Sequence, residues 1–312
     1  MTDAPSDAAT RPILLFGGTG QVGRALLASL PRVGRVLAPL RSEADLADPH
    51  SIRLAVRRAN PAAIVNAAAL TNVDRAEREP ALARTVNEEA PAVIADEAAR
   101  RNVLLVHYST DYVFDGETTK PYTEADRPNP INVYGVSKLA GERAVADANG
   151  LHLIIRTSWV YSPVGAGFVA GFLRDLREQE WIRVVADQVG SPTWSSSLAK
   201  ATTAILEALR ADGGFHLASP DAGIYHLGGS GAATRVEIAH HILDLTQARA
   251  QQRKSVVIPI SAAEFAASAP RPRYSALANA RVERRFGITL PPWRDDLARM
   301  LGVIHVDRSA SC

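Results

Sequence analysis

Apolar, β-prone runs alternate with segments of helical periodicity over the first half of the chain. Helical patterns such as those at 51–59 and 90–100 separate apolar runs that are typical of buried parallel strands. This alternation predicts an α/β protein, with a parallel sheet that is covered by helices on both faces. The apolar runs lie at 11–16, 35–40, 62–68, 103–107 and 151–156.

After residue 160 the alternation weakens, and Gly, Pro and Ser become frequent. We interpret this half as a smaller lobe, from which some segments return to complete the sheet. The helices expected here lie near 166–179, 195–210, 235–249 and 293–301.

A glycine-rich loop follows the first predicted strand and opens the first predicted helix. It contains two overlapping patterns, Gly18-x-Gly20-x-x-Gly23 and Gly17-x-x-Gly20-x-x-Gly23. Glycine permits both the tight turn and the close approach of a pyrophosphate to the helix N-terminus. A structural turn is the alternative, but this position favours dinucleotide binding and a Rossmann-type doubly wound sheet. The cofactor contacts expected in the loop are Gly17, Thr19, Gly20, Gln21, Val22 and Gly23.

The length of 312 residues is sufficient for such a domain and an additional lobe. We expect an NAD(P)-binding domain at 11–162, with segments near 190–228 returning to it. The substrate-binding lobe is then expected at 163–189 and 229–306, between flexible tails at 1–10 and 307–312.

The charge balance and the single cysteine exclude several classes of protein. A net charge of +2 gives no field that favours nucleic acid, and no run approaches the roughly 18 apolar residues of a membrane span. Cys312 alone forms neither an intramolecular disulfide nor a cysteine metal cluster. Residues 1–10 lack the basic and apolar parts of a signal peptide. We therefore expect a cytoplasmic protein without nucleic-acid or membrane partners.

The end of the second predicted strand bears on the choice of cofactor. A carboxylate there would bind the ribose 2′-OH of NAD, whereas an arginine would bind the 2′-phosphate of NADP. The sequence is Leu40-Arg41-Ser42, and the acids Glu43 and Asp45 follow only later. This favours NADPH paired with Arg41, although NADH remains possible and Arg41 could be an ordinary solvated side chain.

Tyr134 and Lys138 are spaced to lie on one face of a predicted helix. Lysine is rare here, with 4 lysines against 31 arginines, so about 0.1 such pairs with the 7 tyrosines is expected by chance. Reduction of a carbonyl needs a proton donor at oxygen, and a nearby cation makes the tyrosine phenol a better one. The pair therefore indicates a reductase.

Thr110 follows a predicted strand, at the sheet edge where ligands bind in open α/β folds. It is the preferred hydroxyl for a substrate carbonyl, with Ser109 as the competitor, and both could instead cap the local backbone. His107, just before them, is expected to be structural. His240 and His241 are expected to be ordinary helix residues, because adjacent side chains diverge and no third metal ligand is evident.

The chain resembles the dTDP-4-dehydrorhamnose reductase family of extended short-chain dehydrogenases/reductases over about residues 11–302. The tyrosine–lysine pair alone indicates only the superfamily, and the segments after 108 and 156 narrow it to this branch. Besides the glycine loop, the motifs in family order are Asn66-Ala-Ala-Ala69, Tyr108-Ser-Thr-Asp-Tyr-Val-Phe-Asp-Gly116, Asn132-Val-Tyr-Gly135 with Lys138, Arg156-Thr-Ser-Trp-Val-Tyr161 and Asp187-Gln-x-Gly-Ser-Pro-Thr193.

The resemblance implies a role for several individual residues. It implies Thr110, Tyr134 and Lys138 as the catalytic set, and Gly20, Gln21 and Val22 under the pyrophosphate. The loop at 187–193 would close over the substrate. Further cofactor contacts are expected from Asp45, Leu46, Ala68, Ala69, Thr71, Tyr134 and Lys138, and substrate contacts from Thr110, Asp111, Tyr112, Asn132, Trp159 and Gln188.

Other expectations concern aromatic, basic and metal sites. Trp159 is expected against a sugar or base rather than as a core anchor. Arg271 and Arg273 are candidates for the substrate diphosphate, with a solvated basic loop as the alternative. Some relatives bridge subunits through a divalent ion held by glutamates, where this chain has Ser196 and Val303. We therefore expect no required metal, and a monomer or weak homodimer.

The resemblance implies NADPH-dependent reduction of the C4 ketone of a dTDP-4-dehydro-6-deoxyhexose, with dTDP-4-dehydro-L-rhamnose as the expected substrate. One alternative is a 4-ketoreductase for another dTDP-deoxysugar in secondary-metabolite glycosylation. Another is a regulatory subunit of the same fold without catalysis, against which the retention of Thr110, Tyr134 and Lys138 argues.

Overall fold

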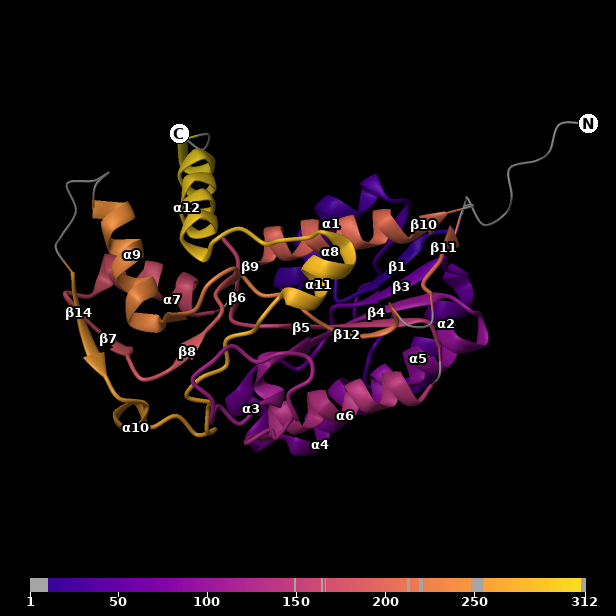
Figure 1. Ribbon diagram of the computed structural model, residues 1–312, viewed down its shortest axis with the longest axis horizontal. Coiled ribbons are helices and arrows are strands. Elements are labelled where there is room, and N and C mark those ends of the chain that lie inside the picture. The colour runs from indigo at the N-terminus through magenta and orange to yellow at the C-terminus, as the bar shows by residue number, and fades with distance from the viewer. Residues whose placement is uncertain are drawn as a thin grey trace, which may run out of the picture.

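A six-stranded parallel sheet forms the centre of the computed structural model, which describes residues 11–148, 150–163, 165, 167–211, 214–218, 221–247 and 255–309, with side chains placed as far as 302. Helices cover both faces of this sheet (Figure 1), which confirms the predicted fold class. The strand order is β12 (Gly223–His226), β5 (His152–Thr157), β4 (Leu104–Thr110), β3 (Ala63–Asn66), β1 (Ile13–Phe16) and β2 (Val36–Leu37).

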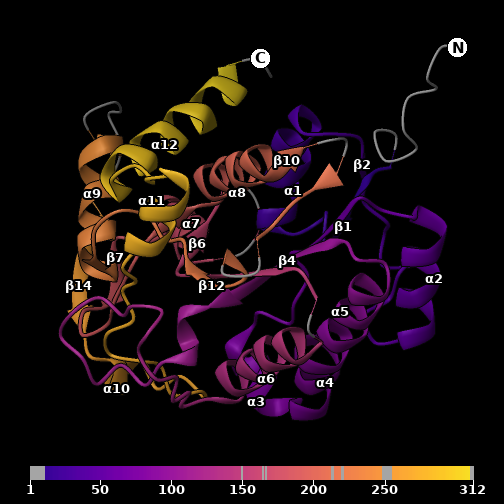
Figure 2. The same cartoon turned by 45° about the vertical axis from the view of Figure 1, so that its right-hand side comes forward.

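Alternate residues of each central strand enter different cores. In β1, Ile13 and Leu15 pack into the core under α1 (Gln21–Ser29) and α8 (Ser195–Leu209). Leu14 packs into the opposite core, under α2 (Pro49–Ala59), α5 (Ala90–Arg100) and α6 (Val133–Asp147). The two helical layers lie on either side of the sheet in Figure 2. Burial on both faces explains why these strands are continuous apolar runs.

The second strand is shorter than the predicted 35–40. β2 spans only Val36–Leu37, and the chain then turns, with the Glu43 carboxylate accepting the Leu40 N–H at 2.7 Å. β1 lies between β2 and β3, so the connections diverge there and a crevice opens at the carboxyl ends of the strands.

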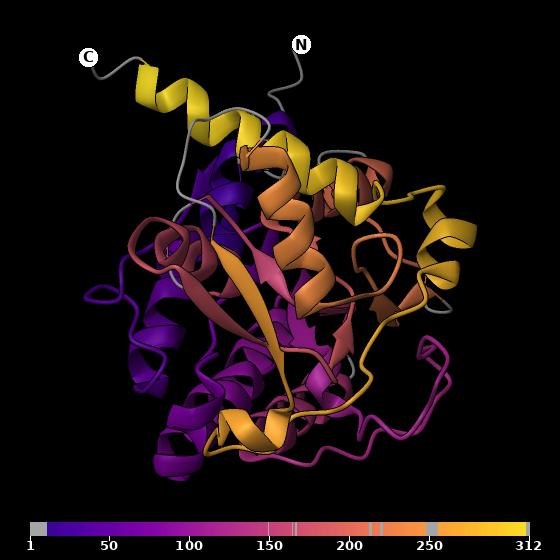
Figure 3. The same cartoon turned by 90° about the vertical axis from the view of Figure 1, so that its left-hand side faces the viewer.

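The second half of the chain builds a separate apolar core around Phe172, Ile242 and Trp293. In Figure 3 the parallel pair β7 (Trp181–Val185) and β14 (Val256–Ile260) faces the viewer, beside α9 (Arg235–Gln247). The pattern did not predict this pair, but it did predict α8, α9, α7 (Phe168–Glu178) and α12 (Trp293–Ser309).

Segments from the region near 190–228 lie against the central layer. α8 packs on α1, and β12 extends the sheet beside β5.

Within the described ranges, no helix combines the length and apolar character that a membrane crossing needs. The remaining elements are η2 (Leu30–Arg32), α3 (Val73–Arg78), α4 (Pro80–Arg84), η3 (Thr85–Glu89), η4 (Asp111–Val113), β6 (Val160–Tyr161), β8 (Val189–Gly190), β9 (Thr193–Trp194), β10 (Arg210–Ala211), β11 (Gly214–Phe215), β13 (Ala233–Thr234), α10 (Ala262–Phe265) and α11 (Ala280–Phe286).

Candidate active site

A cavity of about 790 Å³ opens at the carboxyl ends of β1, β3 and β4 and reaches α9. Its size is typical of sites for small molecules and cofactors. Most of the residues selected from the sequence line it, although they come from seven separate segments. The cavity contains Gly17, Thr19, Gly20, Gln21, Val22, Arg41, Asp45, Leu46, Ala68, Ala69, Thr71, Thr110, Asp111, Tyr112, Tyr134, Lys138, Trp159 and Arg271.

Four of the selected residues lie outside the lining. Gly23 is buried within α1, where a side chain would collide with the backbone of Gly17. Asn132 is the N-cap of α6, Gln188 is buried elsewhere, and Arg273 is exposed. Direct ligand contacts are therefore not supported for these four residues.

The glycine loop leaves the N-terminus of α1 open towards the cavity. Gly17 has φ +84°, and a Cβ there would lie 2.6 Å from the Ala68 nitrogen, so both the turn and the close approach require glycine. Gly20 is the N-cap residue of α1, and no side chain accepts a hydrogen bond from the N–H groups at this helix end. The first turn of α1 carries no acidic residue. Free N–H groups of this kind attract an anion such as a pyrophosphate.

Arg41 lies in the turn after β2, at the rim of the cavity. Its side chain is 78% exposed, and its Nε lies 3.5 Å from the Asp45 carboxylate. An exposed ion pair of this length contributes little stability. The guanidinium is therefore free to turn to a phosphate.

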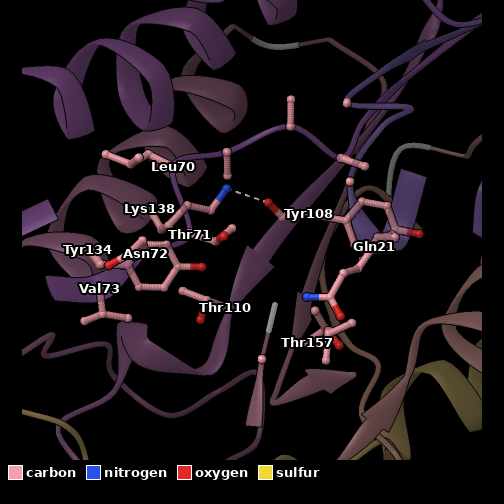
Figure 4. Close-up of a pocket in the computed structure, with 18 of the residues that line it drawn as sticks. Gln21, Leu70, Thr71, Asn72, Val73, Tyr108, Thr110, Tyr134, Lys138 and Thr157 are labelled. Carbon is pink, nitrogen blue, oxygen red and sulfur yellow. Dashed lines mark hydrogen bonds between the residues drawn. The ribbon is translucent and has the colours of Figure 1, made fainter. Parts of the chain in front are cut away.

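Thr110 and Tyr134 are brought together by the end of one strand and the start of one helix. β4 ends at Thr110, and the Asn132 side chain caps α6 by accepting the Gly135 N–H at 2.7 Å. The Asn132 amide also donates to the Pro270 carbonyl at 2.9 Å, which explains why it does not face the cavity. The side chains of Thr110 and Tyr134 lie beside each other in the cavity (Figure 4), and the Thr110 hydroxyl favours the ionised form of the Tyr134 phenol.

Burial raises the pKa of the Tyr134 phenol, so it stays protonated at neutral pH. Figure 4 shows Tyr134, Lys138 and Thr110 around the same part of the cavity. The buried Ser109 hydroxyl has no partner among the described residues. Ser109 and Thr110 both line the cavity, so the preference for Thr110 as the catalytic hydroxyl stays a prediction.

Lys138 is held by a buried polar chain. Its Nζ donates to the Tyr108 carbonyl at 2.6 Å (Figure 4) and lies 3.4 Å from His107 Nε2. His107 Nδ1 in turn accepts from the Asn66 amide at 3.2 Å, and Asn66 accepts the Ala68 N–H. Burial lowers the pKa of the Lys138 ammonium to about 8, against the raising effect of the nearby carboxylate on α6. His107, expected to be structural, packs against the Lys138 side chain.

Asp111 connects three segments beneath the site. One of its carboxylate oxygens accepts from Ser158 at 3.0 Å and Ser275 at 2.5 Å, and the other accepts from Thr110 at 3.2 Å. Burial raises the pKa of the Asp111 carboxyl to about 6, although these hydroxyl donors lower it. Asp111 lines the cavity, and its contacts orient Thr110.

Arg271 joins the two halves of the molecule across the cavity. It donates to Asp74 of α3 at 2.7 Å, and this hydrogen bond is the largest cause that lowers the pKa of Asp74 to about 2. Ser268 and the Ala269 N–H bind the same carboxylate. The charge of Arg271 is therefore already compensated.

A residue that the sequence did not single out also lines the cavity. Arg235, the first residue of α9, lies with its guanidinium carbon 4.2 Å from the centre of the Trp159 ring. Trp159 has φ +42°, and a side chain at Gly190 would collide with its indole. No sequence signal distinguishes Arg235 among 31 arginines.

Comparison with known proteins identifies the family. Residues 11–305 match the family described as RmlD substrate binding domain. The chain belongs to this family. It is 42% identical to dTDP-4-dehydrorhamnose reductase of Burkholderia thailandensis, over 90% of this chain and 95% of that protein. It is 39% identical to the Escherichia coli K12 protein of the same name, over 93% and 96%.

Solved structures of the family have the same fold. dTDP-4-dehydrorhamnose reductase of Bacillus anthracis, in complex with NADP, matches with a TM-score of 0.85 and 31% identity, over 94% of this chain and 99% of that chain. The Clostridium acetobutylicum orthologue matches with a TM-score of 0.86 and 30% identity, over 94% and 99%. These matches confirm the resemblance on which the expected reductase chemistry rested.

The two positions that the resemblance linked to a divalent ion, Ser196 and Val303, carry no carboxylate. Ser196 is in α8, and the side chain of Val303 lies outside the described residues. No group of three His, Cys, Asp or Glu side chains gathers in the described part of the chain. His240 is exposed, and the His241 ring packs edge-on to Trp293. The absence of a metal requirement stays a prediction.

Proposed function

We propose that this chain reduces the C4 ketone of dTDP-4-dehydro-L-rhamnose to give dTDP-L-rhamnose, with NADPH as the hydride donor. The observation that carries the proposal is that Thr110, Tyr134 and Lys138 line the same cavity as the open N-terminus of α1. The family of the chain and the names of its relatives support the same chemistry.

The residues present fit a dinucleotide. The cradle at Gly17 would be filled by any side chain, and the α1 N-terminus has no competing acid. Gly20, Gln21 and Val22 would hold the pyrophosphate, and Arg41 would hold a 2′-phosphate. When bound, NADPH supplies a hydride to the carbonyl carbon.

The protein supplies the proton and the orientation. With substrate bound, the Thr110 hydroxyl turns its proton from Asp111 to the carbonyl oxygen. Tyr134 gives its phenolic proton to the same oxygen as negative charge develops there. The Lys138 cation stabilises the resulting phenolate, which burial alone would disfavour. The carbonyl thus gains one hydride at carbon and one proton at oxygen.

Product analysis tests the choice of substrate. The purified chain is incubated with NADPH and, in separate reactions, with several dTDP-4-keto sugars, and the products are assigned by NMR. We expect dTDP-L-rhamnose as the preferred product. Faster turnover of another dTDP-4-keto sugar would show that this other sugar is the substrate, while the reduction itself would stand. Binding of NADPH without turnover of any sugar would contradict the proposed catalysis.

The cytoplasmic location and the monomeric or weakly dimeric state expected from the sequence stay predictions. We further take the regions 163–189 and 229–306, around the second apolar core, as the substrate-binding lobe, because Phe168 and Arg235 from these regions line the cavity.

A further inference from the structure

Four arginines line the described cavity, and three of them have a carboxylate partner. Arg41 pairs with Asp45, Arg75 with Glu79 and Arg271 with Asp74. Across the residues that the structure describes, Arg235 forms no ion pair. Arg235 is therefore the arginine of the cavity lining whose charge is not balanced by a carboxylate of the described residues.

The surroundings of Arg235 hold the guanidinium in place without neutralising it. It stacks on the Trp159 ring at 4.2 Å and lies 5.2 Å from the Phe168 ring centre. The Tyr112 side chain also interacts with it electrostatically. These contacts fix the plane of a partly desolvated cation, and desolvation lowers the pKa of Arg235. A charge in such surroundings is favourable only with an anion to pair with.

The nearest acidic group does not supply that anion. Asp111 influences Arg235 electrostatically, but its oxygens already accept from Ser158, Ser275 and Thr110. The remaining donors of the guanidinium are thus available to a ligand in the cavity.

We propose that Arg235 binds the diphosphate of the nucleotide-sugar substrate, with Trp159 as the platform that orients it. The assignment rests on the proposed function and replaces the sequence-based candidates Arg271 and Arg273. Arg271 is committed to Asp74, and Arg273 is exposed outside the cavity. A planar guanidinium can bind two phosphate oxygens at once, which an ammonium cannot match.

Binding of dTDP to the full chain, saturated with NADP⁺ so that the cofactor site is filled, tests the assignment. Isothermal titration compares dTDP with thymidine, for wild type and Arg235→Gln. We expect the variant to bind dTDP roughly 10- to 100-fold more weakly, because a charge-assisted hydrogen bond is lost. Its affinities for thymidine and NADP⁺ should be unchanged, which also reports that the variant is folded.

Arg294→Gln is a matched control, since Arg294 also stacks on a tryptophan, at 4.4 Å from the Trp293 ring centre, but is exposed and outside the cavity. It should bind dTDP as the wild type does. The assignment of Arg235 would be overturned if Arg235→Gln bound dTDP as tightly as the wild type, or if only Arg271→Gln lost dTDP affinity. The proposed function would stand in either case. A wild type that binds NADP⁺ but not dTDP would overturn the proposed function as well.

Discussion

The side chains of Thr110 and Tyr134 lie beside each other because a strand ends and a helix begins at the right places. The spacing of Tyr134 and Lys138 could be predicted, since helical periodicity alone places both on one face. The position of Arg235 could not, because it depends on the packing of α9 against Trp159, 76 residues earlier in the chain. The capping role of Asn132 could not be predicted either, because its hydrogen bonds to Gly135 and Pro270 are known only from the folded chain.

Arg41 should decide the choice between the two nicotinamide cofactors. Arg41→Ala removes the cation beside the expected 2′-phosphate, so kcat/KM for NADPH should fall roughly 10- to 100-fold while that for NADH changes little. Steady-state kinetics with each cofactor measure this. Equal efficiencies of wild type with both cofactors, unaltered by the substitution, would show that Arg41 is only a solvated side chain.

The pH dependence of kcat/KM should be bell-shaped. The pKa of Lys138 is lowered to about 8, so its cation is lost as pH rises through 8. The pKa of Asp111 is raised to about 6, so the carboxylate that accepts from Thr110 is lost as pH falls below 6. Burial lowers the pKa of His107 well below 6.5 and raises that of Tyr134, so neither should titrate between these limbs.

The variant Lys138→Arg checks the assignment of the alkaline limb. An arginine stays charged, so any residual activity should persist above pH 8. A wild-type profile that stays flat from about pH 4.5 to 10 would contradict the assignment of both groups.

At the scale of elements, α6 combines the reactive pair and its anchor. Tyr134 and Lys138 face the cavity, and Glu142, one turn further on, pairs with Arg156 of β5 at 2.9 and 2.6 Å. Periodicity predicted the helix but not this pair, because the partners come from different elements. In the same way, β2 proved shorter than predicted because side-chain contacts of Glu43 turn the chain.

Breaking the Glu142–Arg156 pair should destabilise the fold. Both side chains are at most 3% exposed, so Glu142→Gln leaves an uncompensated buried guanidinium and should cost about 3–5 kcal/mol of unfolding free energy. Urea denaturation followed by circular dichroism measures the change. Asp221→Asn, which breaks the more exposed pair with Arg285, should leave stability almost unaltered. Similar losses in both variants would mean that burial does not set the value.

At the scale of the whole molecule, the cavity lies where the central sheet meets the second apolar core. The alternation of strands and helices predicted the first part, because each unit is local in sequence. For the region around the second apolar core, the sequence predicted individual helices but not the strands between them. Its parallel pair β7 and β14 joins segments about 75 residues apart, which no local pattern reveals.

Removal of metal ions should leave the molecule active and its size unchanged. Ser196 and Val303 offer no carboxylates where some relatives bind a bridging ion. We expect NADPH-dependent activity to survive EDTA, and sedimentation to give the same monomer or weak dimer with and without the chelator. Activity that EDTA abolishes and magnesium restores would reveal a metal site.

The central claim is that Tyr134 protonates a keto sugar reduced by NADPH. The most direct measurement follows NADPH oxidation with dTDP-4-dehydro-L-rhamnose for wild type and Tyr134→Phe, with cofactor binding measured in both. We predict turnover by the wild type and a loss of at least about 100-fold in kcat in the variant, with NADPH still bound. Wild-type activity in Tyr134→Phe, or a wild type that binds NADPH and leaves the sugar unreduced, would contradict the account.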